Sequence, residues 1–156
     1  MSLEKYEQYF EPYGLVDRIH HCGTTCATVE DAASTLGVAP ARIAKTLSFR
    51  DGEDCMMIVM AGNMGIDNKK YRNTFGFKAR MLSPDEVHDR IGQMIGGVCP
   101  FAIPEGIHVY TDESLKEHET LFVACGSTYD IVELSPDEIF ECGHAASWVD
   151  VCKERG

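Results

Sequence analysis

The sequence predicts a mixed α/β fold in which a curled sheet has helices packed outside it. Five or more strand-like segments alternate with helical segments, and several of these strands are joined by short hairpin turns. The chain has 156 residues, of which 44% are hydrophobic and 25% are charged, as in an ordinary globular domain. We therefore expect residues 1–156 to form a single domain.

The first part of the chain predicts two helices and a short strand. Helical spacing of aromatic residues over 3–13 ends at Gly14, and residues 16–22 have the pattern of a strand. Thr28 is a suitable N-cap for a helix that stops at Gly37, and Pro40 begins one more helical turn.

The middle of the chain predicts a long antiparallel hairpin followed by two helices. Residues 45–50 and 55–61 read as strands on either side of the turn signal Asp51-Gly52. Residues 62–65 then form a loop. Asp67 caps a helix to about Phe75, residues 77–82 form a strand, and Ser83 opens a helix to about Ile91 through a capping box.

The last part of the chain predicts three strands and a helix. The expected strands are residues 107–111, 121–125 and 130–134, with a turn or short helix at 112–115. Ser135 repeats the capping-box pattern and starts a helix to about Cys142. We expect the tail around Trp148 to be helical or frayed.

Charge is distributed unevenly along the chain. The net charge is −11, which as a single number argues against a nucleic-acid partner. Between Arg42 and Arg80, however, eight basic residues accompany four acidic ones, so that this segment carries +4 and the remainder −15. A basic middle predicts one face that attracts phosphate, and the alternative is a set of solvated charges on a helix and at strand ends.

Cysteine usage indicates a reducing, cytoplasmic location. Seven cysteines, an odd number, accompany an N-terminus without a basic, apolar secretory signal, so we expect free thiols. Cys22 and Cys26 form a CxxxC pair, but no second ligand pair with zinc spacing follows, and we expect no metal. No Walker motif or strand-linked GxGxxG predicts a cofactor. The longest apolar run, residues 55–61, is too short to cross a membrane.

The stretch from Ile91 to Phe101 contains the strongest candidate for a binding turn. Gly96 and Gly97 are adjacent and have apolar residues on both sides, whereas a simple linker would be polar. Adjacent glycines can direct consecutive N–H groups at one point, which suits a carbonyl oxygen or an anion. The alternative is a tight connection packed into the core.

Lys45 stands at the start of an apolar strand and is the candidate cation. It could present a fixed charge to a phosphate, a carboxylate or an oxyanion, and the alternative is an exposed strand-end lysine. A site made of backbone N–H groups and one lysine needs no protein nucleophile. It could bind a carbonyl group and let water attack it.

Eight short segments, taken in order over roughly residues 15–142, carry a family resemblance. They are Thr28–Gly37, Ile43–Arg50, Met60–Lys70, Met81–Val87, Ile95–Phe101, Val109–Leu115, Val123–Ser127 and Val132–Glu138. In this order they resemble the YbaK/ProX family of trans-editing aminoacyl-tRNA deacylases. The resemblance implies a curled, mostly antiparallel, barrel-like sheet with flanking helices. It also implies hydrolysis of the ester between a wrong amino acid and the 3′ end of a tRNA.

The resemblance also assigns roles to individual residues. Lys45 matches the family's essential lysine, and the N–H groups of Gly97 and Val98 would polarise the ester carbonyl. The further substrate-binding positions that it implies are Thr46, Gly62, Gly96, Phe101, Gly126 and Ser127. Lys69, Lys70 and Arg72 are candidates for contact with the tRNA acceptor stem, and a solvated helix face is the equal alternative.

The function expected from the resemblance is trans-editing of a small amino acid, such as alanine, cysteine or serine, on tRNA-Pro. The expected partner is the aminoacyl-tRNA 3′ end, with an aminoacyl-tRNA synthetase as a further candidate. One alternative is a non-catalytic module that binds aminoacyl-tRNA or a synthetase. Another is a small-molecule binding domain unrelated to tRNA. The sequence leaves the oligomeric state open.

Overall fold

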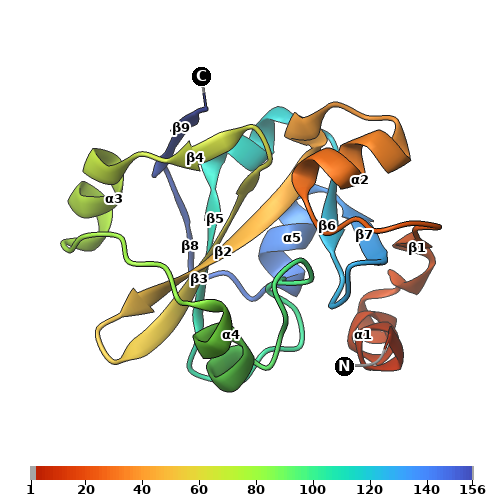
Figure 1. Cartoon of the computed structure of the whole chain (residues 1–156), viewed down its shortest axis with the longest axis horizontal. Coiled ribbons are helices and arrows are strands. Elements are labelled where there is room, and N and C mark those ends of the chain that lie inside the picture. The colour runs from red at the N-terminus through yellow and green to blue at the C-terminus, as the bar shows by residue number, and fades with distance from the viewer. Residues whose placement is uncertain (1–2, 156) are drawn as a thin grey trace.

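A long hairpin forms the middle of the computed structural model, which describes residues 3–155 (Figure 1). Strands β2 (Ile43–Asp51) and β3 (Asp54–Ala61) pair antiparallel over eight positions, from Ala44 opposite Ala61 to Asp51 opposite Asp54. The predicted turn at Gly52 has a φ of +63°, which glycine adopts without strain. Nearly all of β3 is buried, because its apolar residues have packing partners on both faces of the sheet.

The other strands extend this hairpin into a seven-stranded sheet with the order β1-β7-β6-β2-β3-β5-β8. Pairing is antiparallel at β1–β7, β7–β6 and β2–β3, and parallel at β6–β2, β3–β5 and β5–β8. The sheet is not closed, since β1 and β8 are its two edges. A separate antiparallel ribbon pairs β4 with β9. The remaining bounds are β1 Ile19–His21, β4 Met64–Ile66, β5 His108–Asp112, β6 Leu121–Ala124, β7 Asp130–Leu134, β8 Ser147–Val149 and β9 Cys152–Glu154.

Five α-helices within residues 3–155 flank the sheet, so the predicted mixed α/β fold is confirmed. They are α1 Leu3–Phe10, α2 Val29–Leu36, α3 Asn68–Phe75, α4 Pro84–Ile91 and α5 Pro136–Cys142. In Figure 1, α3 and α1 lie at opposite ends of the molecule. Short 3-10 turns cover Glu11–Tyr13, Val16–Arg18, Pro40–Arg42 and Glu113–Glu117.

The helix starts follow the capping residues that the sequence predicts. Thr28 accepts a hydrogen bond from the Asp31 N–H, and Asp67 accepts from two N–H groups of α3. Ser83 and Ser135 each form a complete capping box. These starts were predictable because a cap is a local interaction within four residues.

Four segment predictions were wrong. Residues 77–82 form no strand, and only Met81 makes an isolated bridge to Phe49. Residues 16–18 form a 3-10 turn, so the strand begins at Ile19. Residues 62–65 are not all loop, and the tail is neither helical nor frayed, because β4 pairs with β9 and β8 pairs with β5. Each of these strands has a partner far along the chain, which local periodicity does not reveal.

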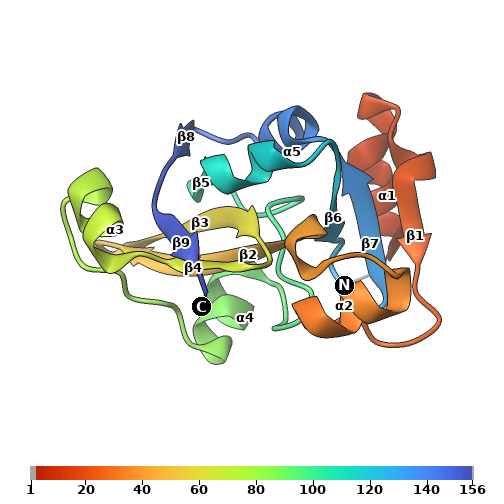
Figure 2. The same ribbon diagram turned by 90° about the horizontal axis from the view of Figure 1, so that it is seen from above.

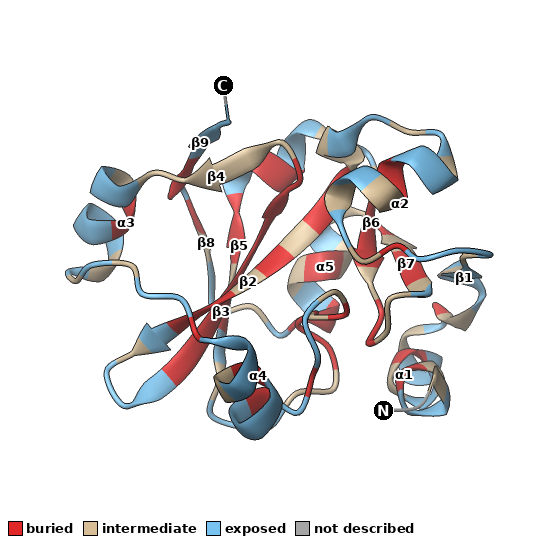
Figure 3. Ribbon diagram, in the orientation of Figure 1, coloured by how far each residue is buried: buried red, intermediate tan, exposed pale blue. Residues whose placement is uncertain are grey.

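The core consists of three packed clusters, and Figure 3 shows its buried residues concentrated along β2, β3 and β6. The largest cluster joins one face of the hairpin to α1, α4 and α5. The second packs the other face against α3 and the tail. The third packs α2 against Ile43, Phe122 and Ile131. Within residues 3–155, no helix is long and apolar enough to span a bilayer.

Candidate functional site

The candidate site is a cavity of about 280 Å³ between α2, the start of β2 and the glycine turn. Its lining is mainly apolar, with Lys45 as the one charged residue in the lining set. The residues around it are Cys26, Ala27, Thr28, Val29, Ala32, Ile43, Ala44, Lys45, Thr46, Leu47, Met81, Ile95, Gly96, Val98, Phe122, Ala124 and Ile131. The structure therefore brings four of the predicted site residues together here: Lys45, Thr46, Gly96 and Val98.

Lys45 is half-buried and borders both this cavity and a second one that adjoins it. Its ammonium group makes no ion pair or hydrogen bond with any of residues 3–155. Burial lowers the pKa of Lys45 below its usual range, and repulsion from Arg155 lowers it further. The site thus contains a poorly solvated cation whose charge no protein group neutralises directly.

The two predicted glycine turns pack against each other, main chain to main chain. A Cβ atom at Gly97 would lie 2.9 Å from the Ser127 nitrogen and 2.9 Å from the Gly126 carbonyl carbon. Gly96 has a φ of +96°, and a Cβ there would lie 2.9 Å from Thr128 Cγ2. Only glycine permits this close approach, which fixes the turn at the cavity wall.

The two N–H groups predicted to polarise a carbonyl differ in availability. The Gly97 N–H donates to the Met94 carbonyl oxygen at 3.0 Å and so closes the turn. The Val98 N–H has no hydrogen-bond acceptor among residues 3–155, and Val98 lines the cavity. Of these two groups, the Val98 N–H is therefore the one without an acceptor, and the Gly97 N–H holds the turn in shape.

Gly126 and Ser127 lie behind the cavity wall and are not among its lining residues. Gly126 has a φ of +85° and packs under the ring of Tyr6. The Ser127 hydroxyl donates to Asp130 Oδ2 at 2.7 Å and accepts from the Tyr129 N–H at 3.0 Å. This geometry makes the second turn a support for the first.

Three further residues that were predicted to bind substrate lie at different distances from the cavity. Thr46 borders the cavity, but its hydroxyl is buried and has no hydrogen-bond partner among residues 3–155. Gly62 lies outside the cavity, where a Cβ would come within 2.4 Å of the Pro40 carbonyl oxygen. Phe101 is fully buried in the core, with its ring centroid 4.8 Å from that of Phe10. Gly62 and Phe101 therefore shape the fold around the site.

The three basic residues predicted to contact the acceptor stem lie on α3 and border neither cavity. The Lys70 ammonium is 3.1 Å from Asp150 Oδ1 and donates to the Cys152 carbonyl oxygen at 3.0 Å. Lys70 thus ties α3 to the tail, whereas Lys69 and Arg72 are exposed.

Several cavity residues were not predicted from the sequence. Met81 and Ile95 are 57% and 58% exposed, and both border the cavity opening. Phe122 and Ile131 come from β6 and β7 and form another wall. A large apolar side chain that remains exposed is a recognisable sign of a binding surface, but its exposure is visible only in the folded chain.

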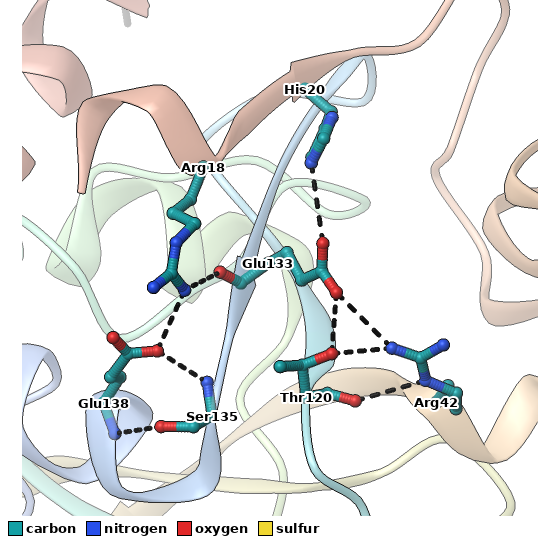
Figure 4. A network of polar contacts seen from close by, with 7 residues as sticks. All are labelled: Arg18, His20, Arg42, Thr120, Glu133, Ser135 and Glu138. Carbon is teal, nitrogen blue, oxygen red and sulfur yellow. Dashed lines mark hydrogen bonds and ion pairs between the residues drawn. The ribbon is translucent and has the colours of Figure 1, made fainter.

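Figure 4 shows a polar network that includes Arg42, Thr120 and Glu133. This network supports the cavity residue Phe122 through Arg42. The Arg42 guanidinium lies over the Phe122 ring, 5.1 Å from its centroid. Arg42 donates to the Thr120 hydroxyl at 2.7 Å, and that hydroxyl donates to Glu133 Oε2 at 2.7 Å. Arg42 therefore acts as a positioning residue for Phe122.

Cys22, which lies near the cavity residue Cys26 but does not line the cavity, has an unreactive thiol. Burial, together with the neighbouring Cys26 thiol, raises the pKa of Cys22 to about 12, so this thiol stays protonated at neutral pH. No group of three or more His, Cys, Asp or Glu residues in 3–155 could hold a metal ion. The chemistry available to the site is that of a cation, backbone N–H donors of the glycine turn and an apolar cavity.

Comparison with known proteins yields a consistent set of relatives. The model of a family described as "Aminoacyl-tRNA editing domain" matches residues 24–142. An uncharacterized protein of Bacillus subtilis (strain 168), YwhH, is 49% identical over 99% of both chains. Proline–tRNA ligases of Geobacillus sp. (strain WCH70) and Aquifex aeolicus (strain VF5) are 23% and 26% identical. The match covers 88% and 99% of this chain, but only 24% and 27% of theirs.

Two solved structures share the fold. The crystal structure of a hypothetical protein has a TM-score of 0.86 at 28% identity and covers 96% of this chain and 99% of its own. A second crystal structure, of "a putative trans-editing enzyme for prolyl tRNA synthetase", has a TM-score of 0.85 at 23% identity. It covers 100% of this chain and 99% of its own. At that identity the second likeness supports the fold alone.

Proposed function

We propose that this chain, which belongs to the aminoacyl-tRNA editing domain family, is a deacylase that hydrolyses mischarged aminoacyl-tRNA. The reaction would release a small amino acid such as alanine, cysteine or serine, with tRNA-Pro as the preferred carrier. The observation that carries the proposal is the position of Lys45. It is a half-buried cation that makes no ion pair or hydrogen bond with residues 3–155, in the lining of an apolar cavity that Gly96 and Val98 of the glycine turn also line.

The chemistry follows from these groups. Water adds to the ester carbonyl carbon, and the carbonyl oxygen gains negative charge. The Val98 N–H is the donor available to that oxygen, and a fixed donor in a poorly solvated site stabilises developing charge effectively. The bond to the ribose oxygen then breaks, and a proton passes to that oxygen, which gives a free amino acid and an uncharged tRNA. Lys45 would hold the terminal phosphate or the aminoacyl group.

Cavity size and lining favour a small acyl group. A volume of about 280 Å³ lies below the range of roughly 300–1,000 Å³ that is typical of sites for larger ligands. An editing site of this kind has a physical purpose, because a synthetase pocket cannot strongly reject an amino acid slightly smaller than its own. The preference for tRNA-Pro is supported by the likeness to proline–tRNA ligases, of which this chain matches about a quarter.

The test is hydrolysis of a panel of mischarged tRNAs, with alanine, cysteine and serine on tRNA-Pro and on unrelated tRNAs. Lys45→Met keeps most of the apolar stem and removes the charge. Lys78→Ala, an exposed lysine that borders neither cavity, is the matched control. We expect turnover by the wild type and by the control, and a loss of at least a hundredfold in Lys45→Met.

The alternative outcomes identify the competing functions. If the wild type hydrolyses no substrate but binds tRNA, the chain is a non-catalytic aminoacyl-tRNA binding module. If it neither hydrolyses nor binds tRNA, the proposal is wrong and the cavity serves a different small ligand. Activity on tRNAs other than tRNA-Pro would retain the deacylase and overturn the carrier preference.

A further inference from the structure

A second cavity of about 740 Å³ adjoins the first and shares Lys45, Leu47 and Met81 with it. Its other wall is the β4–β9 ribbon, which contributes Gly65, Ile66, Lys153, Glu154 and Arg155. Figures 1 and 2 show β9 beside β4, in the half of the molecule that also contains α3. We call this second cavity the β9 groove. It opens from the candidate site toward the surface.

Three cations border the β9 groove. Lys153 and Arg155 are exposed, and neither forms an ion pair with any of residues 3–155. Arg155 is close enough to Lys45 to lower its pKa by repulsion. Glu154 is the one acidic residue in the groove lining, and Asp67 and Glu30 attract Lys153 and Lys45 from farther away. The lining therefore has three cations and one carboxylate, an excess of positive charge that an anionic ligand would offset.

The ribbon holds Arg155 in place by backbone pairing. The Arg155 N–H donates to the Asn63 carbonyl oxygen at 3.1 Å, and Lys153 lies opposite Gly65 in the ladder. A Cβ at Gly65 would lie 3.0 Å from Arg155 Cγ, so the absence of a side chain at residue 65 leaves room for the arginine stem. Lys153 therefore belongs to a paired strand, and Arg155, directly after it, is fixed by a backbone hydrogen bond.

Apolar side chains line the groove together with the cations. Leu47, Ile66 and Met81 line the groove, and Met81 is 57% exposed. A nucleotide presents both of the matching surfaces, a charged phosphate on one side and an apolar base face on the other. The chain as a whole carries a charge of −11, so this local cationic groove would also orient an incoming polyanion.

We propose that the β9 groove binds the phosphodiester backbone of the last nucleotides of the RNA substrate, with Lys153 and Arg155 as the phosphate contacts. The proposal rests on the proposed function, because it needs an RNA 3′ end to enter the site at Lys45. It assigns a binding role to a strand outside residues 24–142, the part of the chain that the family model matches. The exposed residues of α3 would then contact RNA farther from the ester.

The experiment measures binding of a 5′-labelled oligoribonucleotide ending in CCA, the 3′ sequence of tRNAs, by fluorescence anisotropy across a range of salt concentrations. The test variant, which we call the β9 variant, is Lys153→Ala/Arg155→Ala. A second variant, Lys153→Glu/Arg155→Glu, reverses the two charges. The control Lys5→Ala/Lys78→Ala removes the same total charge at two exposed positions that border neither cavity. Thermal midpoints of all variants establish that each one is folded.

We expect the alanine variant to lower affinity about tenfold at low salt and to reduce the slope of log K against log salt by about 1.4, since each phosphate contact on a single strand contributes about 0.7. The charge-reversal variant should weaken binding further, and the control should change affinity less than twofold. Equal affinities of the β9 variant and the control, or a wild type that does not bind the oligonucleotide, would overturn the proposal.

A second readout separates this proposal from the proposed function. Aminoacyl-adenosine carries the same ester without a phosphodiester. Lys153→Ala leaves Arg155 and its effect on Lys45 in place, so this single variant should raise the KM for aminoacyl-tRNA more than the KM for aminoacyl-adenosine. If the wild type hydrolyses both substrates and the β9 variant is unaffected on tRNA, only the role of the β9 groove is wrong. If the oligonucleotide results hold but the wild type hydrolyses neither substrate, the groove binds RNA and the deacylase proposal fails.

Discussion

Gly126→Ala should destabilise the protein by about 2–5 kcal/mol. Two costs contribute. An alanine at a φ of +85° is strained by about 1–2 kcal/mol. Its Cβ would also lie 2.0 Å from Tyr6 Cε2 and 2.4 Å from Tyr6 Cζ, far inside contact distance. Because Tyr6 is only 1% exposed, the ring cannot move to solvent, and overpacking of this kind costs about 1–3 kcal/mol.

Gly76→Ala is the matched control. Gly76 has nearly the same φ, +82°, but a Cβ there would meet no atom within 4 Å. The backbone strain and the change in unfolded-chain entropy are therefore shared by the two variants, and the difference between them isolates the clash with Tyr6.

The assay is urea denaturation followed by fluorescence, with free energies of unfolding compared at a common slope. We expect Gly126→Ala to be less stable than Gly76→Ala by at least about 1 kcal/mol. Equal losses in the two variants would refute the tight packing of the second glycine turn under α1. They would also remove the basis for treating that turn as a rigid support of the site.

Three further predictions concern the cavity itself. Thr46→Val should raise the free energy of unfolding by about 1 kcal/mol in thermal denaturation, because it removes a buried hydroxyl without a partner, and a loss would show that the hydroxyl is satisfied. Ala32→Val narrows the cavity, so kcat/KM should fall more for cysteinyl-tRNA than for alanyl-tRNA, by up to about tenfold. An unchanged ratio of the two kcat/KM values would show that the acyl group binds outside this cavity. Since burial and Arg155 both lower the pKa of Lys45, its charge is lost at a lower pH than that of an ordinary lysine. Arg155→Ala should therefore raise the pKa of Lys45, which NMR of the Lys45 Cε can follow as a function of pH. An unchanged titration would contradict the proximity of Arg155 to Lys45.

Much of the fold could be predicted from the sequence because the relevant forces are local. The caps at Thr28, Asp67, Ser83 and Ser135 act within a single helical turn, and each helix begins where its cap predicts. The hairpin around Gly52 joins neighbouring segments, so its turn signal and its alternating pattern were both readable. The position of Lys45 within the first strand of that hairpin followed from the same pattern.

The site depended on contacts between distant segments, which the sequence could not reveal. Gly97 was predicted to donate to a substrate carbonyl, but the folded turn directs its N–H to Met94 and leaves that of Val98 without an acceptor. Met81 was assigned to a strand, yet it borders both cavities.

The C-terminal tail is the clearest example of a structure that depends on contacts between distant segments. Its periodicity indicated a helical or frayed end, whereas pairing with residues 64–66 makes it a strand and brings Arg155 beside Lys45. The sequence by itself determined where the four capped helices begin and where the central hairpin turns, since capping and turn formation act over a few residues. Only the tertiary structure decided which side chains share a cavity. Strand pairing joins residues about 90 positions apart, and the residues near one strand do not indicate which distant strand will pair with it.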